Sequence, residues 1–263
     1  MSIALKSGTI AQLFFFAIAA FVTYYYLSRA LRGVKLPLRE LTAVAAVSDG
    51  VDKAVEEGKP IFTSPGNMSY LSGLYAPMTV AGMNMLRYTA RLAVRKGARI
   101  VMPVPTNPES FPLIDGIFRE VCVSEGKPEA YHRTDVRYYG AEEYTYSSGA
   151  GSDILREGCS MCVLIGANST CEGFLMGLTY LQGGLVIAGT ARWAHNSTNL
   201  SMADYPLFSE DIYAAGAYVS GDNMVSSTLW GGDLFKLILI GSMFVVLGLT
   251  LLGLPVVTRW LLQ

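Results

Sequence analysis

Small polar residues gather in four segments of this chain, and each segment directly follows a short apolar run. The segments read TSPGNMS, PTNPES, GANSTCEG and GTARWAHNST. Where parallel strands lead into helices, hydroxyl groups and backbone N–H groups at the helix N-termini bind anions. These segments therefore predict a site for a nucleotide or another anionic small molecule. The candidate ligand-binding residues are Ser64, Asn67, Thr106, Asn168, Ser169, Glu172 and Thr190.

A second interpretation of the same residues is purely structural. Loops between strands and helices need small polar residues for their turns and caps. Ser169, followed three residues later by Glu172, fits a capping box, in which the hydroxyl and the carboxylate each accept a backbone N–H. No G-x-G-x-x-G or Walker pattern follows any predicted strand. The sequence is compatible with both interpretations.

Cysteine and histidine are the other residues with the chemistry for catalysis or metal binding. Cys159 and Cys162 have C-x-x-C spacing, but the motif enters an apolar strand and no second ligand pair matches it. We interpret them as buried structural thiols. The sequence identifies no partner for His195, which we interpret as a surface histidine. We therefore predict no metal site and assign no catalytic residue, and the sequence identifies no cofactor.

The elements that position these residues alternate between strands and helices. Apolar runs predict strands at 60–63, 98–104, 136–139, 161–165 and 185–188, and amphipathic patterns predict helices at 77–96, 108–125, 141–157, 169–181 and 209–218. This alternation predicts an α/β fold with a mostly parallel, doubly wound (Rossmann-like) sheet of about five strands.

Two uncharged apolar runs flank this domain, at 10–27 and 237–257. A helix of about 20 residues crosses a hydrocarbon layer of roughly 30 Å, so each run predicts a transmembrane helix. Four basic residues between 29 and 39 follow the first run, which places that flank in the cytoplasm by the positive-inside rule. The predicted organisation is a short external N-terminus at 1–9, a transmembrane helix at 10–28, a basic and amphipathic lead-in at 29–58, a cytoplasmic α/β domain at 59–230, a transmembrane helix at 234–258 and a short external C-terminus at 259–263.

A basic stripe lies on the predicted helix at 77–96. Arg87, Arg91 and Arg95 recur every four residues, so they share one helical face. Contact with anionic lipid headgroups or with a partner protein is one interpretation of this stripe. A solvated face is the other.

The composition excludes some classes of function. Only 16% of the residues are charged, against about a quarter in soluble domains, and the deficit lies mainly in the two apolar runs. The net charge of -1 argues against nucleic-acid binding, which needs a basic excess. Ion transport by a single chain is disfavoured because neither apolar run contains a charged residue.

The end of the domain carries a more specific pattern. An apolar strand runs into Ala188-Gly189-Thr190, a linker with Asp204-Tyr205 follows, and a helix leads to AGAYVSGD at 215–222. This stretch resembles an uncharacterised prokaryotic family of membrane-anchored domains, classed as a domain of unknown function. Residues 105–129 are similar to the second strand–helix unit of that family. The resemblance implies an α/β domain on membrane anchors in a prokaryotic cytoplasmic membrane, and it implies no activity.

Two functions from different classes follow. The first is a membrane-anchored structural or accessory subunit of an oligomeric membrane protein assembly, without catalysis of its own. Its partners would be membrane lipid and either further copies of the chain or other membrane protein subunits. The alternative is a cytoplasmic α/β domain that binds a nucleotide or another anionic small molecule at the strand-end loops, with or without enzymatic activity. The alternative requires that these loops converge on one open cleft.

Overall fold

The computed structural model describes residues 9–34 and 37–252. The chain divides into two compact units: an α/β unit, Arg39–Gly221, and a second unit that combines Met1–Leu38 with Asp222–Gln263. Most of the predicted N-terminal tail, the end of the second predicted span and the predicted C-terminal tail lie outside the described residues.

Six parallel strands form one open sheet in the α/β unit, in the order β3-β2-β1-β4-β5-β6. The direction of winding reverses between β1 and β4, as in the doubly wound folds that bind dinucleotides. The predicted fold class is confirmed, with one strand more than the sequence predicts. The strands are β1 Ile61–Ser64, β2 Ile100–Val104, β3 Val136–Tyr138, β4 Met161–Ile165, β5 Leu185–Thr190 and β6 Tyr205–Phe208.

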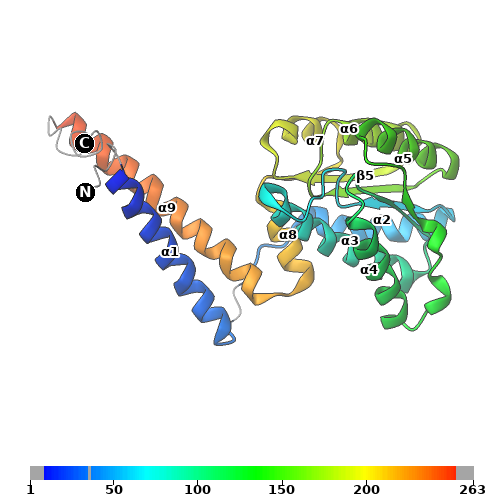
Figure 1. Ribbon diagram of the computed structural model, residues 1–263, viewed down its shortest axis with the longest axis horizontal. Coiled ribbons are helices and arrows are strands. Elements are labelled where there is room, and N and C mark those ends of the chain that lie inside the picture. Colours follow the sequence, from blue (N-terminus) through cyan, green and yellow to red (C-terminus); the bar gives the residue numbers. More distant parts are fainter. Residues whose placement is uncertain (1–8, 35–36, 253–263) are drawn as a thin grey trace, which may run out of the picture. The chain divides into compact units, whose positions relative to one another are not determined.

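Helices cover both faces of the sheet (Figure 1). One hydrophobic cluster joins the sheet to α2, α3, α4 and α8, and a second cluster joins the other face to α5 and α6. The helices are α1 Thr9–Leu31, α2 Thr42–Glu57, α3 Ala76–Lys96, α4 Ser110–Ser124, α5 Glu143–Glu157, α6 Cys171–Leu181, α7 Asn196–Met202, α8 Asp211–Ser220 and α9 Asn223–Leu251, with 3-10 turns at Gly73–Tyr75, Pro128–Ala130, Arg133–Asp135 and Trp193–His195.

The burial of the strands explains their positions in the sheet. Every residue of β1, β2 and β4 is buried, as expected for central strands that are covered on both faces. The edge strands β3 and β6 each have exposed positions. Continuous apolar runs therefore occupy the middle of the sheet and mixed runs occupy its edges.

Helix α2 is part of the α/β unit, whereas the sequence interpretation places it in a lead-in outside 59–230. Val44, Val47 and Val51 are at most 2% exposed and belong to the same core cluster as Ile61. The amphipathic pattern of α2 thus reflects packing on the sheet. The compact unit begins at Arg39 and ends at Gly221, earlier at both ends than the sequence interpretation has it.

Strand β6 is the element of the sheet that the sequence interpretation misses. Its residues read YPLF, and only Leu207 is fully buried. A proline is tolerated at such an edge position because the outer side of the strand forms no ladder bonds. Pairing with β5 begins at Asp204, whose backbone N–H donates to Val186 O at 2.9 Å and whose Oδ2 accepts the N–H of Val186 at 2.8 Å.

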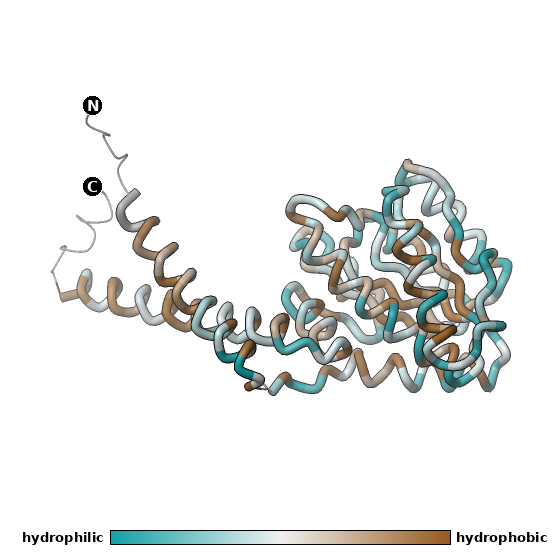
Figure 2. Tube along the Cα trace, turned by 60° about the horizontal axis from the view of Figure 1, so that its bottom comes forward, coloured by the Kyte–Doolittle hydropathy of each residue, from teal (hydrophilic) through white to brown (hydrophobic). Residues whose placement is uncertain are grey.

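In the second unit, α1 and α9 lie side by side and antiparallel (Figures 1 and 2). Both helices are long and apolar enough to cross a membrane. The rings of Tyr26 and Trp230 lie 6.4 Å apart. Helix α9 begins at Asn223, well before the predicted span at 234–258, because Asp222 caps it by accepting the N–H of Met224 at 2.7 Å.

Candidate functional site

The carboxyl ends of the strands bring the predicted ligand-binding residues to one edge of the sheet, around the point where the strand order reverses. Each of the seven candidate residues is at most 6% exposed. Backbone hydrogen bonds of 2.9 to 3.0 Å join the loops that follow β1, β2 and β4 to one another and to the end of β5. These bonds run from Met68 N to Ala167 O, from Ala167 N to Pro65 O, from Thr106 N to Asn67 O and from Gly166 N to Gly189 O.

Glu172 is the centre of this cluster and is fully buried. Its Oε1 accepts the N–H of Asn67 and its Oε2 accepts the N–H of Ser169, both at 2.6 Å. The bond from Ser169 is the carboxylate half of the predicted capping box. Burial raises the pKa of Glu172 to about 7, although the two N–H donors act to lower it. An internal carboxylate thus occupies the N-terminus of α6, where an anionic ligand would bind.

Tyr146 closes the cluster from the side of α5. It is fully buried, and its hydroxyl lies 2.9 Å from Oγ of Ser64. Burial, followed by the charge of Glu172, raises the pKa of Tyr146 well above its ordinary value of 10. Thr106 is held in a similar way, since its Oγ1 donates to Asn67 O at 2.8 Å. The predicted hydroxyl groups are therefore committed to partners within the protein.

Cys171, Ser169 and Glu143 form a connected group at the start of α6. The sulfur of Cys171 lies 3.2 Å from Oγ of Ser169, and that hydroxyl donates to Oε1 of Glu143. Burial, followed by the charge of Glu172, raises the pKa of the Cys171 thiol well above its usual range. Cys171 is therefore a neutral thiol at pH 7, whereas a cysteine nucleophile needs the thiolate form.

Burial acts to raise the pKa of Glu143 as well, but hydrogen bonds from Ser169 and Cys171 outweigh it and the net shift is downward. Glu143 is thus a carboxylate held by donors of its own chain. Cys171 donates to this carboxylate, and the raised pKa of its thiol keeps the proton on sulfur. The group is a hydrogen-bonded network around a neutral thiol.

Two glycines let the loops after β1 and β4 approach each other closely. A Cβ at Gly166 would lie 2.0 Å from Pro65 O, and a Cβ at Gly66 would lie 2.6 Å from the backbone of Ala167. Both residues also have positive φ angles, +143° and +93°. The two loops therefore meet backbone to backbone, and the crevice in which doubly wound folds bind nucleotides is filled.

Two amide oxygens in the cluster lack a hydrogen-bond partner in the described structure. They are Oδ1 of Asn67 and Oδ1 of Asn168, and both side chains are fully buried. The orientation of Asn168 is fixed, because its Nδ2 donates to Leu164 O at 2.9 Å and to Gly189 O at 3.2 Å. Such acceptors are usually satisfied by a buried water. The unmet demand here is for a hydrogen-bond donor, which a water molecule supplies.

Arg192 completes the edge of the sheet, and the sequence interpretation gives it no role. Its Nη1 donates to Asn168 O at 2.9 Å, and its guanidinium lies 5.3 Å from the ring centre of Tyr75. Its backbone N–H donates to Oγ1 of Thr190 at 3.2 Å. Burial and the charge of Arg192 lower the pKa of His195. In the sequence, the only signal for Arg192 and His195 is their position in a polar segment that follows a predicted strand.

The basic stripe on α3 faces acidic residues on α4 and at its C-cap. Arg87 bonds Glu120 at 2.6 Å, and Arg95 bonds Glu125 through two hydrogen bonds of 2.9 Å. Arg91 lies 3.5 Å from the same Glu125. Two carboxylates thus offset most of the charge of the three arginines, which weakens the electrostatic reason to expect lipid contact there.

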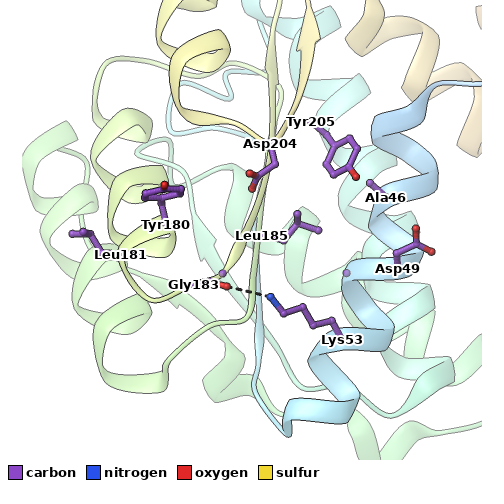
Figure 3. Close-up of a pocket in the computed structure, with 11 residues that line it drawn as sticks. Ala46, Asp49, Lys53, Tyr180, Leu181, Gly183, Leu185, Asp204 and Tyr205 are labelled. Atoms are coloured by element: carbon purple, nitrogen blue, oxygen red, sulfur yellow. Dashed lines mark hydrogen bonds between the residues drawn. The ribbon is translucent and has the colours of Figure 1, made fainter.

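A cavity of about 770 Å³ lies at the opposite, amino-terminal edge of the sheet (Figure 3). Lys53 reaches across it from α2 and donates to Gly183 O at 3.1 Å. Asp204 is bound to the backbone of Val186, as described above. None of the predicted candidate residues lines this cavity. The two charged side chains that bond to the backbone, Lys53 and Asp204, bond at different residues, so they do not form one binding point. The cavity is an open groove.

The C-x-x-C cysteines are buried free thiols, as interpreted from the sequence. Burial raises the pKa of Cys159 to about 12 and that of Cys162 further. Within residues 9–34 and 37–252, no group of three or more His, Cys, Asp or Glu side chains is placed to hold a metal ion. These thiols contribute to the core.

Comparison with known proteins gives the family. The domain of unknown function DUF6754 matches residues 3–261, nearly the whole chain. The chain belongs to this family. The match extends over the α/β unit and over both long apolar helices, so α1 and α9 are part of the family's domain. No curated protein and no solved structure matches the chain.

Proposed function

We propose that this protein is a membrane-anchored accessory subunit of an oligomeric membrane protein assembly and has no catalytic activity of its own. In this proposal α1 and α9 span a prokaryotic cytoplasmic membrane. The α/β unit lies on the cytoplasmic side, and both termini lie outside. The partners are membrane lipid and other membrane-embedded chains.

The observation that carries the proposal is the apolar surface of the α1–α9 pair. Phe16 and Phe21 on α1 are 73% and 70% exposed, and Met243 and Phe244 on α9 are 71% and 69% exposed. Exposed apolar surface of this extent is unfavourable in water and favourable in lipid. Arg29 at the end of α1 and Arg32 beyond it support a cytoplasmic position for that end of the pair.

The closed edge of the sheet supports the proposal that the protein has no catalytic activity of its own. Backbone bonds join the strand-end loops, and Glu172 occupies the helix terminus that an anion would need. The hydroxyl and thiol groups of the cluster are buried and protonated. An α/β unit of this kind is suited to a structural role, since it offers rigid surfaces and no activated chemical group.

The alternative function, binding of a nucleotide or another anionic small molecule, draws support from the strand order alone. An anion at this crevice would have to displace the carboxylate of Glu172 and separate the loops at Gly66 and Gly166. A thermal-shift experiment on the solubilised full chain with ATP, NAD and inorganic phosphate distinguishes the two functions. We expect no stabilisation, and a rise in the melting temperature that follows ligand concentration would favour the alternative.

The anchoring claim is tested by extraction of membranes with alkaline carbonate, which releases peripheral proteins. We expect the full chain to stay in the membrane pellet. The matched control is a chain that ends after Gly221 and begins at Arg39, which lacks both helices and should appear in the soluble fraction. Release of the full chain by carbonate would refute the proposal.

A further inference from the structure

Helix α9 carries a charged pair beside the apolar part of α1. Nζ of Lys236 lies 3.1 Å from Oδ1 of Asp233, and the two side chains are 46% and 66% exposed. In the sequence this pair lies just before the uncharged run at 237–257, and the predicted span at 234–258 includes only Lys236, in its first turn. The pairing of α9 with α1 changes that position.

The contacts between the two helices fix their register. Thr23 of α1 lies against Gly231 of α9, where a Cβ at the glycine would be 3.5 Å from Cα of Thr23. Further along, Phe14 of α1 lines the same apolar hollow as Met243 of α9. Because the helices are antiparallel and each rises about 1.5 Å per residue, Asp233 lies near the level of Phe21 and Lys236 near that of Ile18.

This register places the charged pair at membrane depth. Helix α1 has no charged residue from Thr9 to Ser28, a length of about 30 Å that matches the hydrocarbon layer. If Arg29 marks the cytoplasmic edge, Asp233 lies about 12 Å below that edge and Lys236 about 16 Å below it. The Lys236 side chain extends toward Asp233, and so toward the cytoplasmic edge, by at most about one helical turn. Both charged groups therefore remain below that edge. A shift of the helices that freed the pair from the layer would leave Phe21, which is 70% exposed, in water.

The pair also faces away from α1. Gly231 is buried against α1, whereas the side chains of Asp233 and Lys236 are 66% and 46% exposed. Charged groups on the lipid side of a membrane helix are costly, and they mark contacts with other polar groups in the membrane.

We infer that Asp233 and Lys236 form a contact within the membrane with the same two residues of a second copy of this chain. A partner that pairs with both residues carries a basic group and an acidic group at this depth, one helical turn apart. Its basic group then meets Asp233 and its acidic group meets Lys236. A second copy related by a two-fold axis along the membrane normal meets this requirement by construction, with each Asp233 bonding Lys236 of the other copy. Gly232 has no atom within 4 Å of its Cβ position, so another helix can approach α9 closely there. The inference rests on the proposed membrane anchoring.

The test uses two full-length chains with different affinity tags, expressed together. One carries Asp233→Lys and so has two positive charges, and the other carries Lys236→Asp and so has two negative charges. Neither chain can form the ion pair within its own helix or with its own copies, but the two chains complement each other. We expect complexes that contain both tags to exceed complexes with one tag by about tenfold. Random pairing of the two chains would place both tags in only about half of the complexes.

The matched control reverses a surface ion pair of the α/β unit, Glu57 and Lys59, whose charged atoms lie 3.1 Å apart. Chains with Glu57→Lys and Lys59→Glu should pair at random. A random distribution for the Asp233→Lys and Lys236→Asp chains would overturn the inference. A third chain carries both Asp233→Leu and Lys236→Leu and inserts without any charge cost. We expect it to lose at least about tenfold in self-association, and unchanged association of that chain would also overturn the inference.

Carbonate extraction of every variant separates this inference from the proposed anchoring. If the wild-type chain is released from membranes, the anchoring fails and the inference falls with it. If all chains stay in the membrane but pair at random, the anchoring holds and the contact at Asp233 and Lys236 is refuted.

Discussion

The buried carboxyl group of Glu172 should make the stability of the α/β unit depend on pH in a direction that is unusual for a glutamate. Burial raises its pKa from 4.5 to about 7 in the folded state. The folded protein therefore binds this proton more tightly than the unfolded chain does. Its contribution to stability is fully present below about pH 4.5 and is lost as the pH rises to about 7.

The size of the effect follows from the shift in pKa. Each unit corresponds to about 1.4 kcal/mol, so the free energy of unfolding should fall by about 2 kcal/mol between pH 5 and pH 7.5 on account of this residue. Glu172→Gln removes the titration. It also replaces one carboxylate oxygen with an NH₂ group that faces a backbone N–H, which costs about 1–3 kcal/mol at pH 5. The gap between the two proteins should then close as the pH rises.

The four cysteines provide the assay, since all of them are buried in the α/β unit. Protection of Cys162 from a methanethiosulfonate reagent, measured against urea in the solubilised full chain, reports the unfolding of this unit alone. The control is Glu56→Gln, an exposed glutamate of α2, which should keep the pH dependence of the wild type. Equal pH dependence in the wild type and in Glu172→Gln would refute the reasoning about the buried carboxyl group.

Three further outcomes are expected. Gly166→Ala should lower the free energy of unfolding by about 2–4 kcal/mol in the same assay, because its Cβ meets Pro65 O. Gly158 has a positive φ angle but open space around it, so Gly158→Ala should cost only about 1 kcal/mol. Equal costs would show that the loops do not meet as described. Arg137→Met removes the nearer of the two arginines that pair with Asp153, at 2.6 Å against 3.5 Å for Arg156; the Asp153 side chain is 3% exposed, and the change should cost about 3 kcal/mol at pH 7.5. Since burial already raises the pKa of Asp153, protonation should recover part of that loss as the pH falls to 5, and a loss independent of pH would contradict this account. Trp193→Cys places a thiol at a site that is 86% exposed, and an impermeant maleimide should label it only after the cells are opened; labelling in intact cells would reverse the proposed orientation.

The central part of the fold is predictable from the sequence because its strands are apolar on both faces. The runs at 100–104 and 161–165 are buried at every position, and no other element accommodates them. Strand β6 escapes prediction because a single buried residue, Leu207, gives no periodic pattern. Helix α2 is predicted as an amphipathic segment, but the surface that its apolar face covers is a tertiary property.

The candidate site is predictable in its local part only. The spacing of Ser169 and Glu172 indicates a capping box, and the structure contains the bond from Ser169 N to Oε2 of Glu172. The second bond of Glu172, from the N–H of Asn67, joins residues 105 positions apart and has no signature in the sequence. The same is true of Tyr146, which fills the space next to Ser64. Strand-end loops of this composition therefore predict where a crevice lies, but not whether it is open.

The proposed depth of Asp233 and Lys236 in the membrane escapes prediction for a related reason. The uncharged run at 237–257 starts after both residues, and the predicted span at 234–258 includes only Lys236, in its first turn. The register between α1 and α9 is set by the packing of Thr23 on Gly231 and of Tyr26 on Trp230. That packing places the charged pair beside the apolar part of α1.

The mass of the gently solubilised native complex, with its components identified, tests the central claim most directly. A single chain has a mass of 28.4 kDa. The proposed function predicts a larger complex that contains at least two copies of this chain or further membrane proteins, stable on dilution. A particle of one chain at every concentration, with no co-purifying protein, would contradict the assignment as an assembly subunit.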